Sequence, residues 1–391
     1  MFKLIEEDLI GKKAIHTATE IAHQPEVWQE LFVGLSHQRE VFEEFKNNIQ
    51  SKHDRIRVIF TGAGTSAFVG ETLVPALSNS DSLGKVKYEA ISTTDIVSNP
   101  SEYLNKTIPT LMVSFARSGN SPESIAAVKL GEQFVEHLYH LVITCNKDGQ
   151  LAELVKNNER CMTVLTPDKA HDKGFAMTSS FTSMVLATYL LFMPATGTET
   201  TMNKLVADAE KLIASVSDSI DDISLFDFER IVYLGSGLLG QLSHEAALKM
   251  LELTAGKVVA IHESSLGFRH GPKSILNDRS LVVLFMSQDP YTRQYDVDIL
   301  RELAADNTNI KIVALTEKED AEVKGLADWM IPVNVSEGNY PNDFYLALLY
   351  IIFAQMLSLR KSLQLNITPD NPSPGGLVNR VVKGVTIYGY E

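Results

Sequence analysis

The residues best suited to chemistry in this sequence lie in two short polar segments that each follow a β-rich run and precede a helical pattern. The first is Gly62-Ala63-Gly64-Thr65-Ser66. Glycines let a backbone turn sharply and bring N–H groups close to an anion, while Thr65 and Ser66 add hydroxyl donors at a helix N-terminus. A plain strand-to-helix turn would use the same glycines, so this segment alone leaves a binding role and a structural role open.

The second polar segment, Ser-Phe-Ala-Arg-Ser-Gly-Asn-Ser at positions 114–121, predicts a phosphate cradle. We expect Ser114 to end a strand and Pro122 to occupy the favoured first position of a helix. The residues between them then lie around a helix N-terminus, where unsatisfied N–H groups and the helix dipole stabilise phosphate. A simple helix cap needs one polar residue, whereas this loop offers a positive charge and three hydrogen-bonding side chains: Arg117, Ser118, Asn120 and Ser121.

A predicted helix over residues 242–253 contains ionisable side chains that could move a proton. Glu245, Lys249 and Glu252 are spaced by four and three residues, so they share one helix face. Such a stripe is commonly a solvated charged surface. Here the neighbouring leucines indicate a helix that packs against a sheet, and a carboxylate beside a lysine can serve as a proton shuttle.

His270 is the second candidate for acid–base chemistry. It lies in Arg269-His270-Gly271-Pro272, just before a Gly-Pro break. A single histidine is more often structural or simply exposed, but histidine is also the natural acid and base at neutral pH. Both roles stay open at this point.

From about residue 55 onward, β-rich runs alternate with helical patterns, which predicts α/β domains with parallel sheets covered by helices on both faces. The two sets of runs look like copies of each other. Matching runs are offset by 173 residues (230 − 57), 170 residues (281 − 111) and 172 residues (315 − 143), which indicates a duplication. The predicted strands are 57–61, 86–92, 110–115, 139–144 and 162–165, then 230–234, 258–262, 281–286, 311–316 and 329–333.

The segments outside the two copies are predicted to be accessory. Residues 1–52 look helical and polar, which is typical of an extension rather than a core. A linker is expected near residues 195–225, where Thr, Ser and Asp cluster, and the tail after about residue 366 is rich in Pro and Gly. The predicted domains are a helical extension, two α/β domains and a tail that reaches the active site, at 1–52, 53–200, 215–365 and 366–391.

The bulk composition disfavours several classes of protein. The 391 residues carry a formal net charge of −14, which disfavours binding to nucleic acid and to anionic lipid. The N-terminus lacks the basic and apolar regions of a signal peptide, and the apolar runs at 184–194 and 346–357 are too short to span a bilayer. Cys145 and Cys161 lack metal-ligand spacing, which favours buried free thiols and a cytoplasmic location. We expect no metal.

A competing motif is Gly235-Ser-Gly237-Leu-Leu-Gly240, a formal G-x-G-x-x-G after a predicted strand. With Glu263 at the end of the next strand it resembles a dinucleotide-binding fingerprint. The spacing to Glu263 is long, and a dinucleotide site would leave the polar loop before Pro122 without a role. We therefore set this interpretation aside.

Together these segments resemble the double sugar-isomerase (SIS) domain proteins over nearly the whole chain. The similarity is greatest to the galactosamine-6-phosphate deaminase/isomerase group, often labelled tagatose-6-phosphate ketose/aldose isomerase. It is more distant to the isomerase half of glucosamine-6-phosphate synthase. The matching segments are Thr19-Glu-Ile-Ala-His-Gln-Pro25, Gly64-Thr-Ser66, Ser118-Gly-Asn-Ser121, Glu245-Ala-Ala-Leu-Lys249-Met-Leu-Glu252, Arg269-His-Gly-Pro272, Asp370-Asn-Pro372 and Val382-Lys383-Gly-Val-Thr386.

The resemblance implies two tandem SIS domains, each a parallel sheet of about five strands flanked by helices. It implies that Glu252 carries a proton between C1 and C2 and that His270 opens the sugar ring from a neighbouring subunit. Lys383 would lie over the substrate from the tail. Ala116 departs from the synthase, which has a phosphate-binding serine there. The residues expected to bind substrate or phosphate are Gly64, Thr65, Ser66, Arg117, Ser118, Asn120, Ser121 and Lys249.

The implied activity is conversion of D-galactosamine 6-phosphate to D-tagatose 6-phosphate and ammonia, without a cofactor, in a cytoplasmic homodimer or higher homo-oligomer. No nucleophilic cysteine precedes the first domain, so release of ammonia from glutamine is excluded. A simple ketose/aldose phosphate isomerase and a deglycase acting on fructose-amine 6-phosphates remain alternatives. A non-catalytic sugar-phosphate sensor is a third; it would need the phosphate cradle but not Glu252, His270 and Lys383 together.

Overall fold

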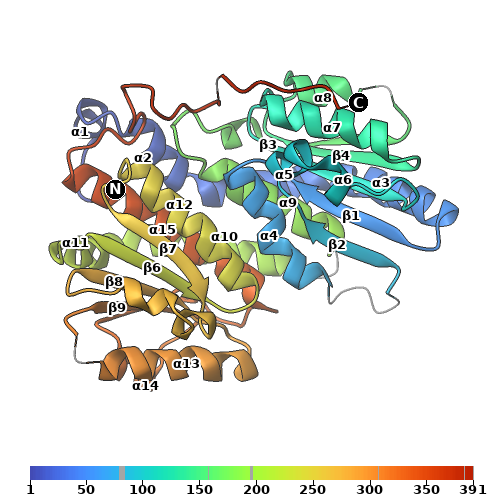
Figure 1. The fold of residues 1–391 in the computed structure, drawn as a ribbon. Coiled ribbons are helices and arrows are strands. Elements are labelled where there is room, and N and C mark those ends of the chain that lie inside the picture. The colour runs from blue at the N-terminus through green and yellow to red at the C-terminus, as the bar shows by residue number, and fades with distance from the viewer. Residues whose placement is uncertain (79–83, 157, 194–196, 307, 383, 391) are drawn as a thin grey trace. The chain divides into compact units, whose positions relative to one another are not determined.

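The structure is a computed structural model that describes residues 1–78, 84–156, 158–193, 197–306, 308–382 and 384–390. The chain divides into two compact units, each built on one parallel sheet (Figure 1). The first-sheet unit comprises Glu26–Asp172, Ser179–Gly197 and Gly375–Glu391. The second-sheet unit comprises Met1–Pro25, Lys173–Thr178 and Thr198–Pro374.

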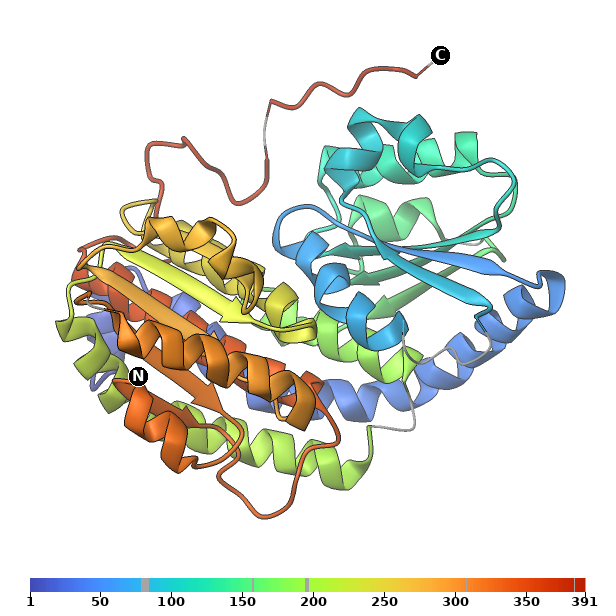
Figure 2. The same cartoon turned by 60° about the horizontal axis from the view of Figure 1, so that its bottom comes forward.

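The first sheet has the strand order β2-β1-β3-β4-β5, with every pair parallel. Its central strands β3 and β4 are buried along their whole length, as expected for a parallel sheet covered on both faces. Helices α5 to α8 cover one face and α4 and α9 cover the other (Figures 1 and 2). The bounds are β1 (Ile56–Thr61), α4 (Thr65–Ser78), β2 (Val86–Ala90), α5 (Thr93–Ser98), α6 (Pro100–Tyr103), β3 (Thr110–Ala116), α7 (Pro122–Phe134), β4 (Leu138–Thr144), α8 (Gln150–Leu154), β5 (Cys161–Leu165) and α9 (Ser179–Phe192).

The second sheet has the order β10-β9-β8-β6-β7, also all parallel. Read from β7, this is the order of the first sheet, so the predicted duplication and both five-stranded sheets are confirmed. Helices α12 and α15 pack together beside β6 and β7, and α13 contributes to the core cluster on the sheet. The bounds are β6 (Arg230–Gly235), α12 (Leu238–Leu253), β7 (Val259–Ser264), β8 (Ser280–Phe285), α13 (Pro290–Ala305), β9 (Lys311–Thr316), α14 (Ala321–Leu326), β10 (Trp329–Pro332) and α15 (Asp343–Gln364).

The N-terminal helices are part of the cores, which corrects the expectation of an accessory extension. Helices α1 (Glu6–Gly11), α2 (Ile15–Ala22) and α3 (Gln24–Lys52) each bury apolar residues. In the second-sheet unit, Gln24 Nε2 donates to Gln355 Oε1 at 2.8 Å, and both side chains are buried. In the first-sheet unit, buried Trp28 donates its indole N–H to Thr182 Oγ1 at 3.0 Å. The exposed faces of these helices are polar, so the apolar residues that they bury were not recognised as core residues in the sequence.

The predicted linker at residues 195–225 was wrong for most of its length. Helices α10 (Glu199–Ser215) and α11 (Ser217–Leu225) occupy it and pack against α15. Thr198 caps α10 by accepting a hydrogen bond from the Thr201 N–H. The Thr, Ser and Asp residues that suggested a loop therefore belong to two amphipathic helices, in which Thr198 is a cap and Asp208 and Ser224 are buried.

Helix α15 is longer than its apolar run indicated. Its 22 residues are long and apolar enough to cross a membrane by length and composition, but 94% of the apolar window is buried inside the protein. Polar residues such as Gln355 and Ser358 interrupt the run, and both are buried among neighbouring helices. Burial on all sides is typical of a central core helix.

Candidate functional site

The glycine turn after β1 has the tight geometry that the sequence predicts. A Cβ atom added at Gly62 would lie 2.5 Å from the Ser66 carbonyl carbon, so only glycine fits there. Gly64 has φ +55°, in the left-handed region that favours glycine. Thr65 and Ser66 follow at the start of α4, and both are buried, at 4% and 6% exposed. The turn therefore brings backbone N–H groups and two hydroxyls to the carboxyl end of β1.

The second polar segment begins later than predicted. Ser114 lies within β3 and is buried, because the strand extends to Ala116. The loop proper is 117–121, which we call the phosphate loop. Its Gly119 has φ +69°, and an added Cβ would lie 3.3 Å from the Gly149 Cα. The loop thus packs closely on the turn that follows β4.

Hydrogen bonds from the turn after β4 hold the phosphate loop in place. The Asn146 side-chain amide donates to the Ser118 carbonyl at 2.8 Å. The Asn120 side-chain oxygen accepts the Gln150 N–H at 3.1 Å, so this oxygen supports the loop itself. The Ser121 hydroxyl donates to the Glu123 carboxylate at 2.8 Å. These contacts fix the conformation of the loop before any substrate arrives.

The helix that follows the phosphate loop begins with open N–H groups. Ser121 is the N-cap residue of α7, yet in the described part of the chain its side chain makes no capping hydrogen bond to the helix backbone. In the second sheet the equivalent N-cap, Asp289, accepts from the Tyr291 and Thr292 N–H groups at 3.1 and 2.9 Å. Only the first copy therefore leaves its helix N-terminus for an external anion.

A second contrast between the copies lies after β2 and its equivalent β7. The Thr93 N–H donates to the Gly62 carbonyl at 2.8 Å, and the Ser265 N–H donates to the Gly235 carbonyl at 3.0 Å. The Thr93 hydroxyl is buried, and no acceptor for it occurs among the described residues. The Ser265 hydroxyl instead donates to the Asp296 carboxylate at 2.6 Å. At this position the first copy has a hydroxyl donor with no acceptor among the described residues, whereas the hydroxyl of the second copy already donates to a carboxylate.

The glycine turn and the phosphate loop follow neighbouring strands. In the first sheet β1 lies between β2 and β3. The chain adds β2 on one side of β1 and then β3 on the other side, so the order of the strands reverses between β1 and β3. Ligands of open parallel sheets bind at the carboxyl ends of strands at this switch point. Both predicted phosphate-binding segments therefore lie at one edge of the first sheet.

Arg117 and the tail meet in the same unit. The Arg117 side chain is buried, and its guanidinium donates to the Arg380 carbonyl at 3.1 Å. The Arg380 guanidinium in turn donates to the Asp172 carbonyl. Farther along, the Tyr390 carbonyl accepts from Gln133 at 3.1 Å. Sequence reasoning did not single out Arg380, which lies between the two matching C-terminal segments. Lys383 lies outside the described residues.

Helix α12 presents a buried triad of charges in the second-sheet unit. The Lys249 ammonium lies 3.3 Å from Glu245 Oε1 and 2.5 Å from Glu252 Oε2. The side chains of Lys249 and Glu245 are 0% exposed, whereas that of Glu252 is 23% exposed. Burial lowers the pKa of Lys249, but the two carboxylates outweigh it and hold that pKa above its ordinary value. The predicted shared face is confirmed, and Glu252 is the carboxylate of the three that reaches solvent.

Ion pairs to α13 hold the segment that carries His270. Arg269 contacts Glu302 at 2.5 Å and Asp298 at 2.8 Å. Lys273 contacts Glu302 at 2.6 Å. His270 itself is exposed, and it lies in the chain between Arg269 and Lys273, which are both held by these ion pairs. Its backbone is thereby fixed while its imidazole faces solvent.

The glycines of the Gly235–Gly240 turn are required by close packing. An added Cβ at Gly235 would lie 2.7 Å from the Leu239 carbonyl carbon, and one at Gly240 would lie 2.9 Å from the Gly235 carbonyl oxygen. Gly237 has φ +57°. Close packing of strand on helix accounts for these glycines without a ligand.

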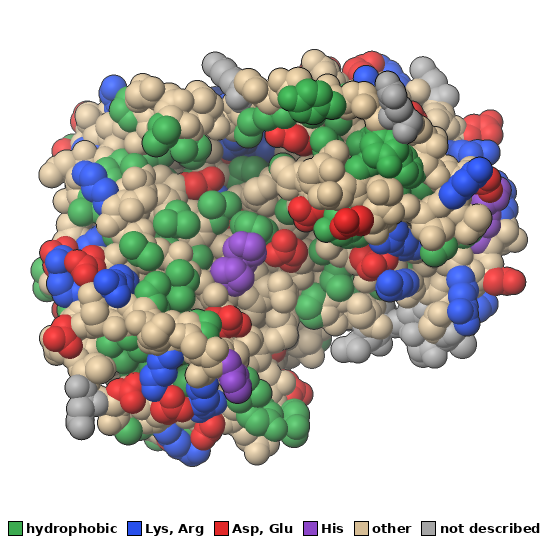
Figure 3. Space-filling model, in the orientation of Figure 1, with side chains coloured by type: hydrophobic (Ala, Val, Ile, Leu, Met, Phe, Trp, Pro, Cys, Tyr) green, Lys and Arg blue, Asp and Glu red, His purple; other side chains and the backbone are tan. Residues whose placement is uncertain are grey.

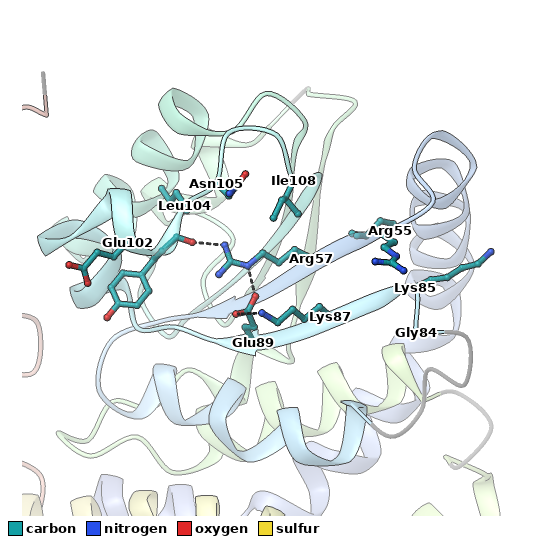
Figure 4. Close-up of a pocket in the computed structure, with 12 residues that line it drawn as sticks. Arg55, Arg57, Gly84, Lys85, Lys87, Glu89, Glu102, Leu104, Asn105 and Ile108 are labelled. Atoms are coloured by element: carbon teal, nitrogen blue, oxygen red, sulfur yellow. Dashed lines mark hydrogen bonds and ion pairs between the residues drawn. The ribbon is translucent and has the colours of Figure 1, made fainter.

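One cavity, of about 550 Å³, lies away from both candidate segments (Figure 4). It includes Arg57, whose guanidinium binds Glu89 and the Tyr103 carbonyl, and Lys87, whose ammonium lies 3.1 Å from Glu89. These residues precede the carboxyl ends of β1 and β2, so the cavity opens toward the opposite edge from Gly62. Arg57 and Lys87 share the Glu89 carboxylate, and the cavity opens away from the glycine turn, so we do not assign it the substrate.

No group of three or more metal-ligating side chains occurs among the described residues. Basic and acidic side chains are interspersed on the face in Figure 3 rather than gathered into a single basic patch. Cys145 is buried, which raises the pKa of its thiol to about 12. Cys161 is half-buried, and burial raises its pKa to about 11. Both thiols are free, as predicted, and remain protonated at neutral pH.

The chain was compared with known proteins. Residues 52–194 and 224–363 each match the SIS domain family. The chain is 43% identical to D-galactosamine-6-phosphate deaminase AgaS of Shewanella sp. (strain ANA-3), over 99% of this chain and 95% of that protein. A crystal structure of tagatose-6-phosphate ketose/aldose isomerase from Escherichia coli has a TM-score of 0.87 and 38% identity, covering 96% and 97% of the two chains. A structure from Clostridium novyi NT has a TM-score of 0.95 and 43% identity, covering 100% and 99%.

Proposed function

Because this chain belongs to the SIS domain family and to the family of D-galactosamine-6-phosphate deaminase AgaS proteins, we propose that it converts D-galactosamine 6-phosphate and water to D-tagatose 6-phosphate and ammonia. Binding of the phosphate group is supported by the open N-terminus of α7, which lies beside the hydroxyls of the phosphate loop. The observation that carries the chemistry is the partly exposed carboxylate of Glu252, held by a buried lysine.

The phosphate binds at the first sheet in this proposal. Ser118 supplies a hydroxyl donor, and Ser121 supplies a second when its hydroxyl turns from the Glu123 carboxylate to the phosphate. The N-terminus of α7 supplies N–H groups, and Thr65 and Ser66 supply donors from the neighbouring turn. Gly64 provides the left-handed backbone that the turn needs. Arg117 and Asn120 support the loop, since their side chains contact the tail and the turn after β4. The net charge of −14 makes such a local donor set necessary for an anionic substrate.

The proposed reaction begins with ring opening, in which His270 moves a proton to the ring oxygen. Glu252 then removes the C2 proton, which is acidic beside the C1 aldehyde, and an enolamine forms. Return of the proton to C1 gives an imine at C2. Water adds to that imine, and ammonia leaves to give the ketose. A positioned acid or base contributes about 10²–10⁴-fold to such steps.

Lys249 has a positioning role rather than a substrate contact in this scheme. Its side chain is 0% exposed and lies between Glu245 and Glu252. It thereby holds the Glu252 carboxylate in place along one helix face. We further propose that the tail, including Lys383, covers the substrate, that the enzyme is a cytoplasmic homo-oligomer, and that His270 acts in a neighbouring subunit.

The first experiment is an ammonia-release assay on the purified chain. We expect release from galactosamine 6-phosphate and expect much less from glucosamine 6-phosphate and from the N-acetyl forms. Glu252→Gln should abolish turnover while sugar-phosphate binding by calorimetry survives. Glu210→Gln, an exposed change on α10, is the matched control and should behave as wild type. Full activity of Glu252→Gln would exclude Glu252 as the base.

The second experiment tests the phosphate loop. The double change Ser118→Ala and Ser121→Ala should raise KM by well over tenfold, because at least two hydroxyl contacts to a charged group are lost, at about 1.5–3 kcal/mol each. Ser101→Ala, on an exposed surface of the same unit, controls for the loss of a hydroxyl. An unchanged KM would remove the phosphate loop from the site.

The alternatives make different products. A simple ketose/aldose phosphate isomerase would interconvert the sugars without ammonia, and a deglycase would release an amino acid or amine from fructose-amine 6-phosphates. A sensor would bind sugar phosphate without turnover. The pairing of Glu252 with a buried lysine favours proton transfer over a sensor, because a binding protein needs no such group.

A further inference from the structure

The second sheet has a set of donors at its own switch point, between β6 and β8. The Ser236 hydroxyl follows β6, the Ser265 hydroxyl follows β7, and the Ser287 N–H follows β8. Hydroxyls and amides at the carboxyl ends of strands are the groups that bind phosphate at such points. This set lies at the edge of the second sheet that corresponds to the edge of the first sheet where the anion site is proposed.

One carboxylate accepts from all three donors. Asp296 Oδ1 accepts from Ser236 Oγ at 2.8 Å and from Ser265 Oγ at 2.6 Å. Asp296 Oδ2 accepts from the Ser287 N–H at 2.9 Å. The Asp296 side chain is completely buried, so these contacts replace its hydration. Burial raises the pKa of Asp296, and the three hydrogen bonds and Arg293 oppose that shift.

The equivalent residue of the first copy is apolar. Asp296 is six residues after Pro290 (296 − 290), and Val128 is six residues after Pro122 (128 − 122), each proline being the first residue of its helix. Val128 is fully buried in the apolar cluster of the first sheet. The first copy therefore has no carboxylate at this helix position.

We infer that Asp296 is a built-in anion that occupies the phosphate-like cradle of the second copy and positions the segments that carry Glu252 and His270. Ser236 lies two residues before α12, which carries Glu252. Ser265 begins the segment that leads to His270. By accepting from both serines, the Asp296 carboxylate ties the starts of these two segments to the end of β8.

The inference has two consequences. The second copy cannot accept a phosphorylated substrate, because its donors are already used, so each chain has one anion site. Asp296 also becomes a positioning residue for catalysis, at a distance from the reacting atoms. This second consequence rests on the proposed function, whereas the first can be tested without it.

The test uses Asp296→Ala, which leaves a space the size of a carboxylate, and formate as the probe. We expect Asp296→Ala to lower Tm and to lower kcat about tenfold or more, with a smaller change in KM, because misplaced catalytic groups slow the reaction more than they weaken binding. Formate should raise both Tm and kcat of this variant in a saturable way. It should leave wild type and the exposed control Asp278→Ala unchanged.

Asp296→Asn keeps the shape of the side chain but places an NH₂ group or a neutral oxygen against the donors. It should lose Tm and kcat, and formate should not restore them because the space is filled. A wild-type Tm and kcat for Asp296→Asn would overturn the inference, as would a folded Asp296→Ala that does not respond to formate. If wild type lacked deaminase activity, the proposed function would fail, while the Tm response to formate would still decide whether Asp296 replaces an anion.

Discussion

Replacing Lys249 with methionine removes an ammonium that pairs with two carboxylates, Glu245 and Glu252, in the second-sheet unit. Lys249 and Glu245 are both completely buried, with 3.3 Å between ammonium and carboxylate. At an effective dielectric constant of about 20, a pair at this distance attracts by about 5 kcal/mol before the cost of desolvation is subtracted. Removal of one partner of a buried pair costs about 3–5 kcal/mol, because the other charge is left without compensation.

We therefore expect Lys249→Met to lower Tm by on the order of 10 °C. Adding Glu245→Gln should recover most of that loss, because the uncompensated buried charge is then gone. The activity should respond differently. Both variants lose the ammonium 2.5 Å from Glu252, so kcat should stay at least about tenfold below wild type in both.

The measurements are thermal unfolding and ammonia release for wild type, the single variant and the double variant. Lys257→Met removes an exposed lysine of the same unit and should change neither quantity. A Lys249→Met enzyme with wild-type Tm and kcat would refute the reasoning about buried charge. A double variant that regains kcat together with Tm would refute the positioning role of Lys249.

Three further predictions concern stability and reactivity. The His140 ring is buried with no hydrogen-bond partner among the described residues, and burial lowers its pKa to about 4. His140 therefore takes up a proton near pH 6.5 in the unfolded chain but only near pH 4 in the native chain. The free energy of unfolding should fall by about 3 kcal/mol as pH falls from 6.5 to 4. In urea unfolding, His140→Leu should remove that loss. Asp370 accepts from the N–H and the hydroxyl of Thr17, in the first turn of α2, at 2.8 Å each. Asp370→Ala should therefore lower the free energy of unfolding by about 0.5–2 kcal/mol in the same assay. An unchanged urea midpoint would contradict a stabilising role for these two hydrogen bonds. Cys145 should resist a thiol reagent at pH 8 until the protein unfolds, because burial keeps it protonated; rapid native labelling would contradict this.

The local patterns of the sequence determined most of the fold. The apolar runs of the central strands, such as β3 and β4, are continuous because both faces of a parallel sheet are buried, and such runs are visible without a structure. The near-constant offset between the copies predicted a duplication, and the equal strand orders of the two sheets confirm it. The spacing of Glu245, Lys249 and Glu252 placed them on one helix face, because helical geometry depends only on local sequence.

The sequence could not show which charges are compensated or which donors are free, because those depend on residues far apart in the chain. In the second copy Asp289 caps α13, and the larger difference from the first copy is Asp296, which no local motif indicated. The segment at 195–225 looked like a linker because helix caps and loops share residue types. Its helices pack against α15, which begins 118 residues after α11 ends (343 − 225). The residue types determined that this chain could bind a phosphate; the tertiary structure decided which copy has the open donors, because only folding brings Asp296 to the serines of the second sheet and leaves Val128 in the first.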